Sequence, residues 1–293
     1  MICHSHTLAL RAVNRVWPMF YKIKLLSWAR RAGLAEPVIL LSFDCDTDRD
    51  AEAAVRVQEY LQKFGMTAFY AVPGELLETY WGEYCKLLDL GAQFVNHGYR
   101  RHADINEMTG KPFSTFTYCN VPDDVWKEDI LLGHDVLTKL TGTPPTVFRT
   151  PHFGEFNKKE QLSKMYSFVA SLGYRVSSST KPVFGMLNGS VYNCGEGLVE
   201  LPLNGCLSKP AQLMDSWGFL SAPDALGKKK LLRELESYRK LFEAKLPIVL
   251  NLYFDPADIV NEPDVLHALS CFSGFSCITL DDCEFLSLAH TAK

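Results

Sequence analysis

Val38-Ile-Leu-Leu-Ser-Phe-Asp-Cys-Asp-Thr47 is the stretch that decides how this chain folds. Its first six residues are apolar or aromatic, except for Ser42. A short run rich in Val, Ile and Phe predicts a strand that is buried on both faces of a sheet. Carboxylates follow at Asp44, Asp46 and Asp48. Charged groups beside a buried strand must be paired, hydrogen-bonded or bound to a metal, so the stretch predicts a strand that ends in a polar site.

Two of these acids are placed to act together. Asp44 and Asp46 are two residues apart, so in an extended chain their side chains point to the same face. We expect them to face a catalytic cation. The alternative is that they cap the helix that follows the strand, in which case they would take no part in chemistry.

Length and composition limit the class of protein. The 293-residue chain is long enough for one large α/β domain or two small ones. Its hydrophobic content of 47% and aromatic content of 12% exclude a disordered chain. A net charge of −4 provides no basic field, so we expect no nucleic-acid partner. The nine cysteines are scattered and form no Cys-x-x-Cys pair, which argues against a disulfide framework and favours a reducing compartment.

The first 35 residues differ from the rest of the chain in charge. They contain six basic residues and no acidic residue, whereas the remainder holds 24 basic and 34 acidic residues, a balance of −10. The six are Arg11, Arg15, Lys22, Lys24, Arg30 and Arg31. Apolar residues recur at helical spacing from residue 8 to residue 34, with Pro18 as a break. Residues 1–36 are therefore predicted to form a helical extension.

Two interpretations of this extension stay open. It could be a basic amphipathic helix that makes a peripheral contact with a membrane, or an appended helix that covers one end of the main domain. No apolar run in the chain reaches the ~18 residues of a membrane span. Arg11 and Arg15 also interrupt the apolar stretch that a secretory signal would need. We therefore expect a cytoplasmic protein that, under the first interpretation, contacts the inner membrane face.

From residue 37 onward, strand and helix patterns alternate. Strands are predicted at residues 38–43, 67–72, 93–96, 146–149, 174–177, 198–203, 247–254 and 276–280. Helices are predicted at residues 50–64, 80–90, 125–141, 159–172, 228–244 and 265–270. This alternation predicts parallel βα units. About seven repeats without a change in composition predict a single barrel-like domain over residues 37–293.

Polar residues gather where the predicted strands stop. The groups are Asp44 and Asp46, then Asn96, His97 and His102, then Arg149 and His152, and finally Asp255. In barrels, catalytic residues lie at the carboxyl ends of the strands. This arrangement predicts one shared site built from four distant parts of the chain.

Five stretches resemble, in order, the polysaccharide deacetylase (NodB homology) family. They are Ser42-Phe-Asp-Cys-Asp46, Asn96-His-Gly-Tyr-Arg-Arg-His102, Phe148-Arg-Thr-Pro-His-Phe-Gly154, Leu172-Gly-Tyr-Arg-Val-Ser-Ser178 and Val249-Leu-Asn-Leu-Tyr-Phe-Asp-Pro256. The resemblance covers residues 38–256. It implies an α/β fold, a distorted (β/α) barrel of about seven parallel strands. It also implies removal of N-acetyl groups from sugars, or opening of related amides, with one divalent metal.

The resemblance implies a metal site made by Asp46, His97 and His102. Two imidazoles and one carboxylate leave open positions on Zn²⁺ for water and a substrate oxygen. Such a metal lowers the pKa of its water toward ~7 and polarises an amide carbonyl. The alternative for His97 is a core histidine that is hydrogen-bonded to a neighbour.

The resemblance also implies the catalytic groups. Asp44 would be the base, and Arg149 would orient it, because a carboxylate held by a guanidinium stays ionised. The backbone N–H of His152 would join the metal in stabilising the oxyanion. Arg149 could instead simply pair with a strand-end acid. Trp217 is a candidate for stacking on a sugar face, or else a packed tryptophan.

The chain departs from the family in two places. Four residues, 98–101, separate the two histidines, where the family has three; Gly98 could absorb the extra residue in a turn, or His102 could be displaced. Asp255-Pro256 stands where the family has His-Pro, whose histidine protonates the leaving amine. An aspartate with a reference pKa of ~3.9 needs burial or a negative neighbour to hold a proton. Asp255 could otherwise bind a substrate amine or hydroxyl.

The expected function is that of a metal-dependent deacetylase of an N-acetylated sugar or glycan precursor in surface-polysaccharide metabolism. One alternative is a hydrolase of another non-peptide amide, such as a cyclic ureide or a formyl-sugar. Another is a carbohydrate-binding relic with altered catalysis, in which the changed histidine spacing and the lost His-Pro mark decay.

Overall fold

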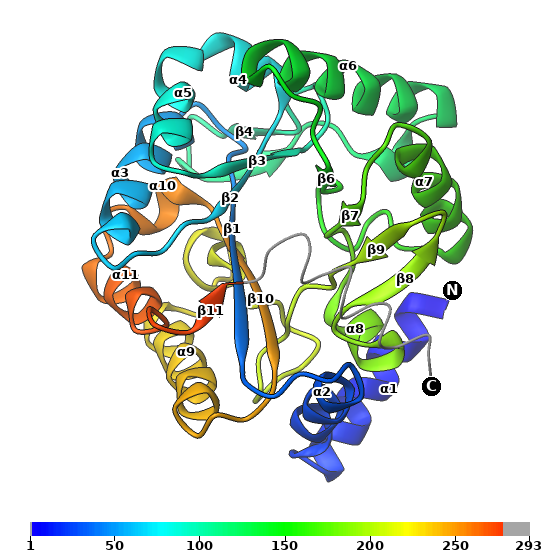
Figure 1. Ribbon diagram of the computed structural model, residues 1–293, viewed down its shortest axis with the longest axis vertical. Coiled ribbons are helices and arrows are strands. Elements are labelled where there is room, and N and C mark those ends of the chain that lie inside the picture. Colours follow the sequence, from blue (N-terminus) through cyan, green and yellow to red (C-terminus); the bar gives the residue numbers. More distant parts are fainter. Residues whose placement is uncertain (1, 278–293) are drawn as a thin grey trace.

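A curled, mostly parallel sheet with helices on its outer side forms the body of the protein (Figure 1). The computed structural model describes residues 2–277. Along the sheet the strands are β10 (Val249–Phe254), β1 (Val38–Asp44), β2 (Phe69–Val72), β3 (Gln93–Asn96), β6 (Val147–Phe148), β7 (Val176–Ser177), β9 (Leu198–Glu200) and β8 (Tyr192–Gly195). Only the last pair, β8 with β9, is antiparallel. The predicted distorted (β/α) barrel of about seven parallel strands is confirmed.

β1 is the central strand of this arrangement. It pairs with β10 along Val38 to Phe43, while its other edge is divided between two strands. β2 pairs with the carboxyl half of β1, and β11 (Ser276–Cys277) pairs with the amino end. The rest of the last predicted strand, residues 278–280, lies outside the described residues.

The predicted helices are all present, with ends that differ by a few residues. They are α3 (Asp50–Gln62), α5 (Trp81–Asp89), α6 (Asp123–Thr141), α7 (Lys159–Ser171), α9 (Lys228–Glu243) and α11 (Pro263–Ser270). Several short elements were not predicted. These are α4 (Gly74–Thr79), β4 (Ala103–Ile105), β5 (Pro112–Ser114), η1 (Tyr118–Asn120), α8 (Pro182–Asn188), β8 (Tyr192–Gly195), η2 (Trp217–Ser221) and α10 (Pro256–Ile259).

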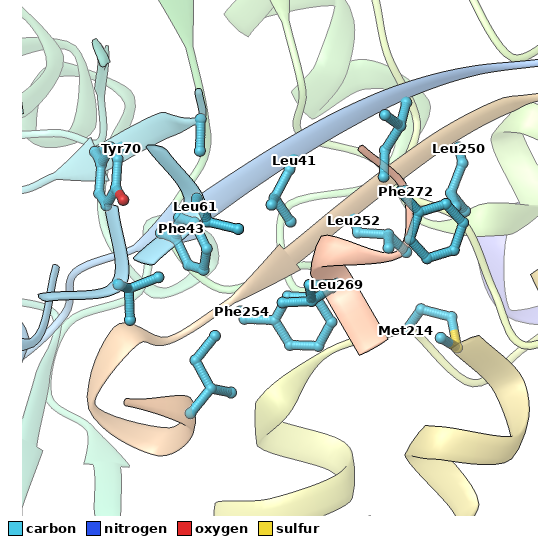
Figure 2. Close-up of a cluster of buried hydrophobic side chains, with 14 of the residues drawn as sticks. Leu41, Phe43, Leu61, Tyr70, Met214, Leu250, Leu252, Phe254, Leu269 and Phe272 are labelled. Atoms are coloured by element: carbon cyan, nitrogen blue, oxygen red, sulfur yellow. The ribbon is translucent and has the colours of Figure 1, made fainter. Parts of the chain in front are cut away.

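Side-chain alternation along β1 explains its burial on both faces. Ile39, Leu41 and Phe43 pack outward in the core between the sheet and its helices. Figure 2 shows Leu41 and Phe43 beside the β10 side chains and facing Leu269 of α11. Leu40, between them in sequence, belongs to the core inside the barrel. Each such large buried side chain contributes about 2 kcal/mol, which fixes the register of β1.

The same alternation turns the inner face polar at the carboxyl ends of the strands. Ser42 and Asp44 continue the inward series of Leu40, and both are buried. On β10, the inward positions Asn251 and Tyr253 are also buried. Polar groups thus fill the interior at this end of the barrel, whereas aliphatic side chains fill the rest.

The N-terminal extension forms two helices that dock on the barrel. They are α1 (Ile2–Val16) and α2 (Phe20–Arg31), and Pro18 lies in the break between them. Both helices contact α8. The Tyr21 hydroxyl accepts a hydrogen bond from the Gly205 backbone N–H at 2.9 Å, and the Trp28 indole donates to the Met186 carbonyl at 2.8 Å. The boundary between extension and barrel at residues 36 and 37 stays a prediction. No helix in the described chain is both long enough and apolar enough to cross a membrane.

Candidate active site

A cavity of about 540 Å³ opens at the carboxyl end of β1. Its walls come from five segments that are distant in sequence. They are residues 44–50 after β1, the β4–β5 hairpin, residues 152–155 after β6, residues 213–221 around η2, and residues 253–258 at the end of β10. Of the polar residues at the predicted strand ends, Asp44, Asp46, His152 and Asp255 line this cavity.

Asp46, His97 and His102 form the one group of ligand atoms, within residues 2–277, that lies close enough to hold a metal ion. The candidate ligand atoms lie within 4.8 Å of one another. His102 Nε2 is 2.8 Å from Asp46 Oδ1, and His97 Nε2 is 3.4 Å from the same oxygen. Burial favours the neutral Asp46 carboxyl, yet the two histidines outweigh it and hold its pKa well below the ordinary value.

The hydrogen bonding of His97 fits a metal ligand. Its Nδ1 lies 2.8 Å from the backbone carbonyl oxygen of Arg149, and a carbonyl can only accept. The proton therefore sits on Nδ1, and the lone pair of Nε2 points toward Asp46. Metal-binding histidines are commonly fixed in this way by a carbonyl behind the ring. A neutral imidazole, a second imidazole and a carboxylate make a donor set that suits a divalent cation.

Gly98 absorbs the extra residue between the two histidines. Its φ of +78° is a left-handed conformation that favours glycine. A Cβ at this position would clash with the Asp129 carboxylate and the Tyr118 hydroxyl. Asp129 holds the turn by accepting hydrogen bonds from the Arg100 backbone N–H at 2.9 Å and from the Tyr118 hydroxyl at 2.8 Å. The turn brings the side chain of His102 back to Asp46.

Asp44 forms a buried ion pair with Arg149. Arg149 Nη1 donates to Asp44 Oδ1 at 2.5 Å, and both residues are almost wholly buried. The rest of the guanidinium is held by Ser178, whose hydroxyl and backbone carbonyl both accept from it. Asn251 donates to the same hydroxyl at 3.1 Å. Arg149 therefore has a fixed orientation, and Asp44 lies 3.9 Å from His97 Nε2 in the same group of side chains.

The amino-acid sequence matches the sequence profile of the polysaccharide deacetylase family over residues 31–176. The chain belongs to this family. The matched part contains Asp44, Asp46, both histidines, Arg149 and His152, and it ends well before Asp255. A search of curated protein sequences found no match.

Solved structures similar to this chain share its fold at low sequence identity. A protein assigned as a polysaccharide deacetylase from Mycobacterium smegmatis is 15% identical, with a TM-score of 0.63 over 86% of this chain and 91% of that one. The allantoinase Puue is 12% identical, with a TM-score of 0.62 over 86% and 90%. A probable polysaccharide deacetylase from Pseudomonas aeruginosa is 12% identical, with a TM-score of 0.61 over 89% and 93%. These likenesses support the distorted barrel and nothing finer.

His152, predicted to provide a backbone N–H to the oxyanion, has an unusual backbone. Its φ is +56°, which is uncommon for a residue with a side chain. The ring lines the cavity, and Nε2 donates to the His102 carbonyl at 2.8 Å. Backbone strain of this kind collects at functional sites when the surroundings hold it in place. The ring thus supports the backbone at His102, directly before β4.

Four further carboxylates line the cavity and are here called the acidic wall: Asp50, Asp215, Asp255 and Asp258. Only Asp255 was predicted from the sequence. Burial raises the pKa of Asp50 and of Asp215 to about 7. Burial, and then the neighbouring charge of Asp258, raises the pKa of Asp255 well above its ordinary value.

Neutral groups are the hydrogen-bond partners of the acidic wall. The Ser216 hydroxyl lies 2.9 Å from Asp255 Oδ2, and the Ser221 hydroxyl donates to Asp258 at 2.7 Å. Asp50 accepts from the Ala257 backbone N–H at 3.0 Å. Within residues 2–277 no ion pair joins any of the four to a cation. Two signals in the sequence could have indicated the wall: the Asp-Pro-Ala-Asp run of residues 255–258, and Asp215 beside Trp217.

The β4–β5 hairpin, which the sequence did not predict, begins directly after His102 and forms one wall of the cavity. Its tip is tied down on two sides. Lys111 Nζ donates to the Ala222 carbonyl at 3.0 Å, and Arg49 donates to the Gly110 carbonyl at 3.2 Å. Phe113 of the hairpin and Trp217 of η2 both line the cavity and are partly exposed. The hairpin therefore carries a metal-site histidine at its base and an aromatic ring at its rim.

Proposed function

We propose that this protein is a metal-dependent deacetylase that hydrolyses the N-acetyl amide of a sugar or glycan precursor in surface-polysaccharide metabolism. The observation that carries the proposal is the meeting of the Asp46–His97–His102 group with the Asp44–Arg149 pair at one cavity. Membership of the polysaccharide deacetylase family supports the amide chemistry. The pathway and the metal identity are our inference from that membership.

The residues of the chain divide the chemistry among them. A divalent cation held by Asp46, His97 and His102, which we propose to be Zn²⁺, would supply a Lewis acid to the amide carbonyl and the attacking water. Asp44 accepts the proton of that water, and the ion pair with the Arg149 guanidinium holds the carboxylate in a fixed orientation. The backbone N–H of His152 stabilises the negative charge that develops on the carbonyl oxygen.

Asp255 is proposed as the acid that protonates the leaving amine. Its place at the end of β10 is the one where the family has a histidine. Burial and the negative charge of Asp258 favour its protonated form, as the role requires. The Ser216 hydroxyl lies 2.9 Å from Asp255 Oδ2 and fixes this carboxyl group, which lines the cavity. One carboxylate thus acts as base and another as acid, because their surroundings differ.

The rim of the cavity suits a sugar. Trp217 and Phe113 present aromatic rings from two different walls, and such rings stack on the apolar faces of sugars. The interior between them is rich in carboxylates and therefore disfavours anionic groups next to the scissile amide. We propose a neutral or amine-bearing N-acetylated sugar as the reacting unit.

Acetate release tests the proposal. The protein is stripped with a chelator, reloaded with Zn²⁺, Ni²⁺ or Co²⁺, and assayed on N-acetylated oligosaccharides, sugar nucleotides and lipid-linked glycans. Metal-dependent acetate release supports the proposal, and the Asp46→Ala variant, which lacks a ligand, serves as control. Formate release, or opening of a cyclic ureide, would replace the deacetylase with the alternative amide hydrolase. A protein that takes up no metal on titration would be the carbohydrate-binding relic.

A further inference from the structure

The outer surface of the two N-terminal helices is unusually apolar. Among the described side chains, fourteen large apolar ones are exposed, and six of them lie between residues 8 and 23. They are Leu8, Val13, Val16, Trp17, Met19 and Ile23. Val16 is the most exposed of the six, at 87%. The other eight are spread over the remaining 250 or so residues, so this gathering is a feature of α1 and α2 rather than of the whole surface.

Helical spacing separates the docked face of α1 from its free face. Leu10 and Asn14, four residues apart, are buried against the barrel, and Asn14 donates to the Ser208 carbonyl at 3.2 Å. Leu8 and Val16, eight residues apart, lie on a single exposed stripe on the side away from those two. The free face of α1 is therefore apolar although the helix already buries another face.

α2 repeats this division. Tyr21, Leu25 and Ala29 recur at four-residue spacing and are buried against the barrel. Ile23 and Arg30 lie on the opposite side and are exposed. The docked face accounts for the folding of the helix, and its outer face is not explained by any contact within the described chain.

Within the described residues, five of the six cations of this extension have no partner side chain; the exception is Arg31, whose guanidinium lies 5.0 Å from the centre of the Trp28 ring. None of the six forms an ion pair with another residue in the part of the chain that the structure describes. Arg11 and Arg15 are exposed and lie one turn apart beside the apolar stripe of α1. The surface thus combines an apolar stripe, an aromatic residue at its end in Trp17, and unpaired positive charge.

We propose that the outer face of α1 and α2 binds the surface of an anionic lipid bilayer, with both helices lying in the interface plane. An apolar stripe flanked by Arg and Lys fits the boundary between acyl chains and acidic headgroups. Tryptophan is favoured at that depth. Each cation near such a surface adds about 1 kcal/mol of attraction, which salt weakens. A spanning segment is not required, in keeping with the length of the two helices.

Binding in this way leaves the cavity free. α2 leads into the amino end of β1, whereas Asp44 stands at the carboxyl end of the same seven-residue strand. At about 3.3 Å per residue, the two ends are roughly 20 Å apart. Figure 1 shows α1 and α2 near the amino end of β1, on the side away from α4 and β4. The bilayer would hold the enzyme without covering its site, so the inference does not depend on the proposed function.

Vesicle sedimentation of the full chain tests the inference. We expect binding to vesicles of phosphatidylcholine with phosphatidylglycerol, little binding to phosphatidylcholine alone, and release as salt rises from about 0.1 to 0.5 M. Arg11→Glu with Arg15→Glu should weaken binding by about 30-fold or more, from about 1 kcal/mol for each lost cation. Val16→Asn should weaken it less, through the apolar contact alone.

The matched control is Lys229→Glu with Lys230→Glu, which makes the same change in net charge on the exposed surface of α9. This variant should keep most of the binding. Wild-type protein that stays in the supernatant with anionic vesicles would overturn the inference, as would equal loss of binding in the two double variants. A dimer that disappears in the Arg11 and Arg15 variant would show that the face pairs copies of the chain instead. Unchanged melting temperatures show that the variants are folded.

Discussion

Two groups of carboxylates that line the cavity lie in opposite surroundings. Asp44 and Asp46, here called the paired side, face a guanidinium and two imidazoles at distances of 2.5 to 3.4 Å. On the acidic wall, Asp50, Asp215 and Asp255 face hydroxyls and backbone N–H groups. Both groups contain buried carboxylates, Asp44 on the paired side and Asp50 and Asp215 on the acidic wall, so burial alone does not decide their charge. The nearest partner does.

This difference explains how one site can hold a base and an acid together. A buried carboxylate with a cation beside it stays ionised, and one with only neutral donors and like charges keeps its proton. The paired side therefore supplies a proton acceptor and a metal ligand. The acidic wall supplies a proton donor in the same 540 Å³ space. Enzymes that use two carboxylates commonly separate their roles in this way.

The largest effect is expected from Asp44→Asn. The amide cannot accept the proton of the attacking water, so deacetylation should fall by at least about 10³-fold. Metal content, measured by plasma emission spectrometry, should stay at the wild-type level because Asp46, His97 and His102 are untouched. Loss of the metal in this variant would show that Asp44 is a ligand and that the two aspartates were assigned in the wrong order.

Asp255→Asn is expected to have the next largest effect, because it removes the proton donor of the acidic wall. Turnover of an N-acetyl sugar should fall by about 10²-fold or more. Hydrolysis of an activated aryl acetate should change by less than about threefold, since its leaving group departs without a proton. Equal losses on both substrates would instead give Asp255 a role in binding or in folding the site.

A smaller effect is expected from Gly98→Ala, which tests the turn on which the paired side depends. The added Cβ would clash with the Asp129 carboxylate. An alanine also cannot adopt a φ of +78° without backbone strain. Displacement of His102 should weaken metal affinity by about 10- to 100-fold in a competitive chelator titration. Gly142→Ala is the matched control, since Gly142 has a φ of +77° with open space around it. It should lose only about 1 kcal/mol of stability and keep its metal affinity.

The sequence predicted the paired side well because local patterns encode it. The apolar run of β1 fixed its alternation, and the two-residue spacing placed Asp44 and Asp46 on one face. The four residues between His97 and His102 allowed two outcomes, a turn at Gly98 or a displaced His102, and the sequence did not decide between them. The roles of these residues stay predictions, whereas the structure shows that they meet.

The acidic wall could not be predicted in the same way. Asp50, Asp215 and Asp258 come from three distant segments. Apart from the run of residues 255–258 and the nearness of Asp215 to Trp217, nothing in the sequence distinguishes them from capping or surface acids. The hairpin was missed for a related reason: β4 and β5 have three residues each, too few for a period of two to be recognised. α8 has only seven residues, too few for a helical period to be recognised, although Pro182 at its first turn is a residue that helices favour there.

The smallest effect is expected from Asp215→Asn, which tests how much the buried carboxylates of the acidic wall reduce the stability of the fold. Asp215 has a pKa of about 7 in the folded protein and an ordinary value near 3.8 when unfolded. The folded state therefore favours the protonated form of Asp215. This preference stabilises the fold fully below about pH 4, and the stabilisation is lost as pH rises through 7. Asp215→Asn removes that loss, so the variant should gain melting temperature over wild type between pH 4 and pH 8. The gain should exceed about 1 kcal/mol, or a few degrees.

Asp224→Asn, which changes an exposed carboxylate, should follow the wild type at both pH values. A constant difference between Asp215→Asn and wild type would mean that Asp215 is already charged in the fold, and the contrast between the two sides would fail at that residue.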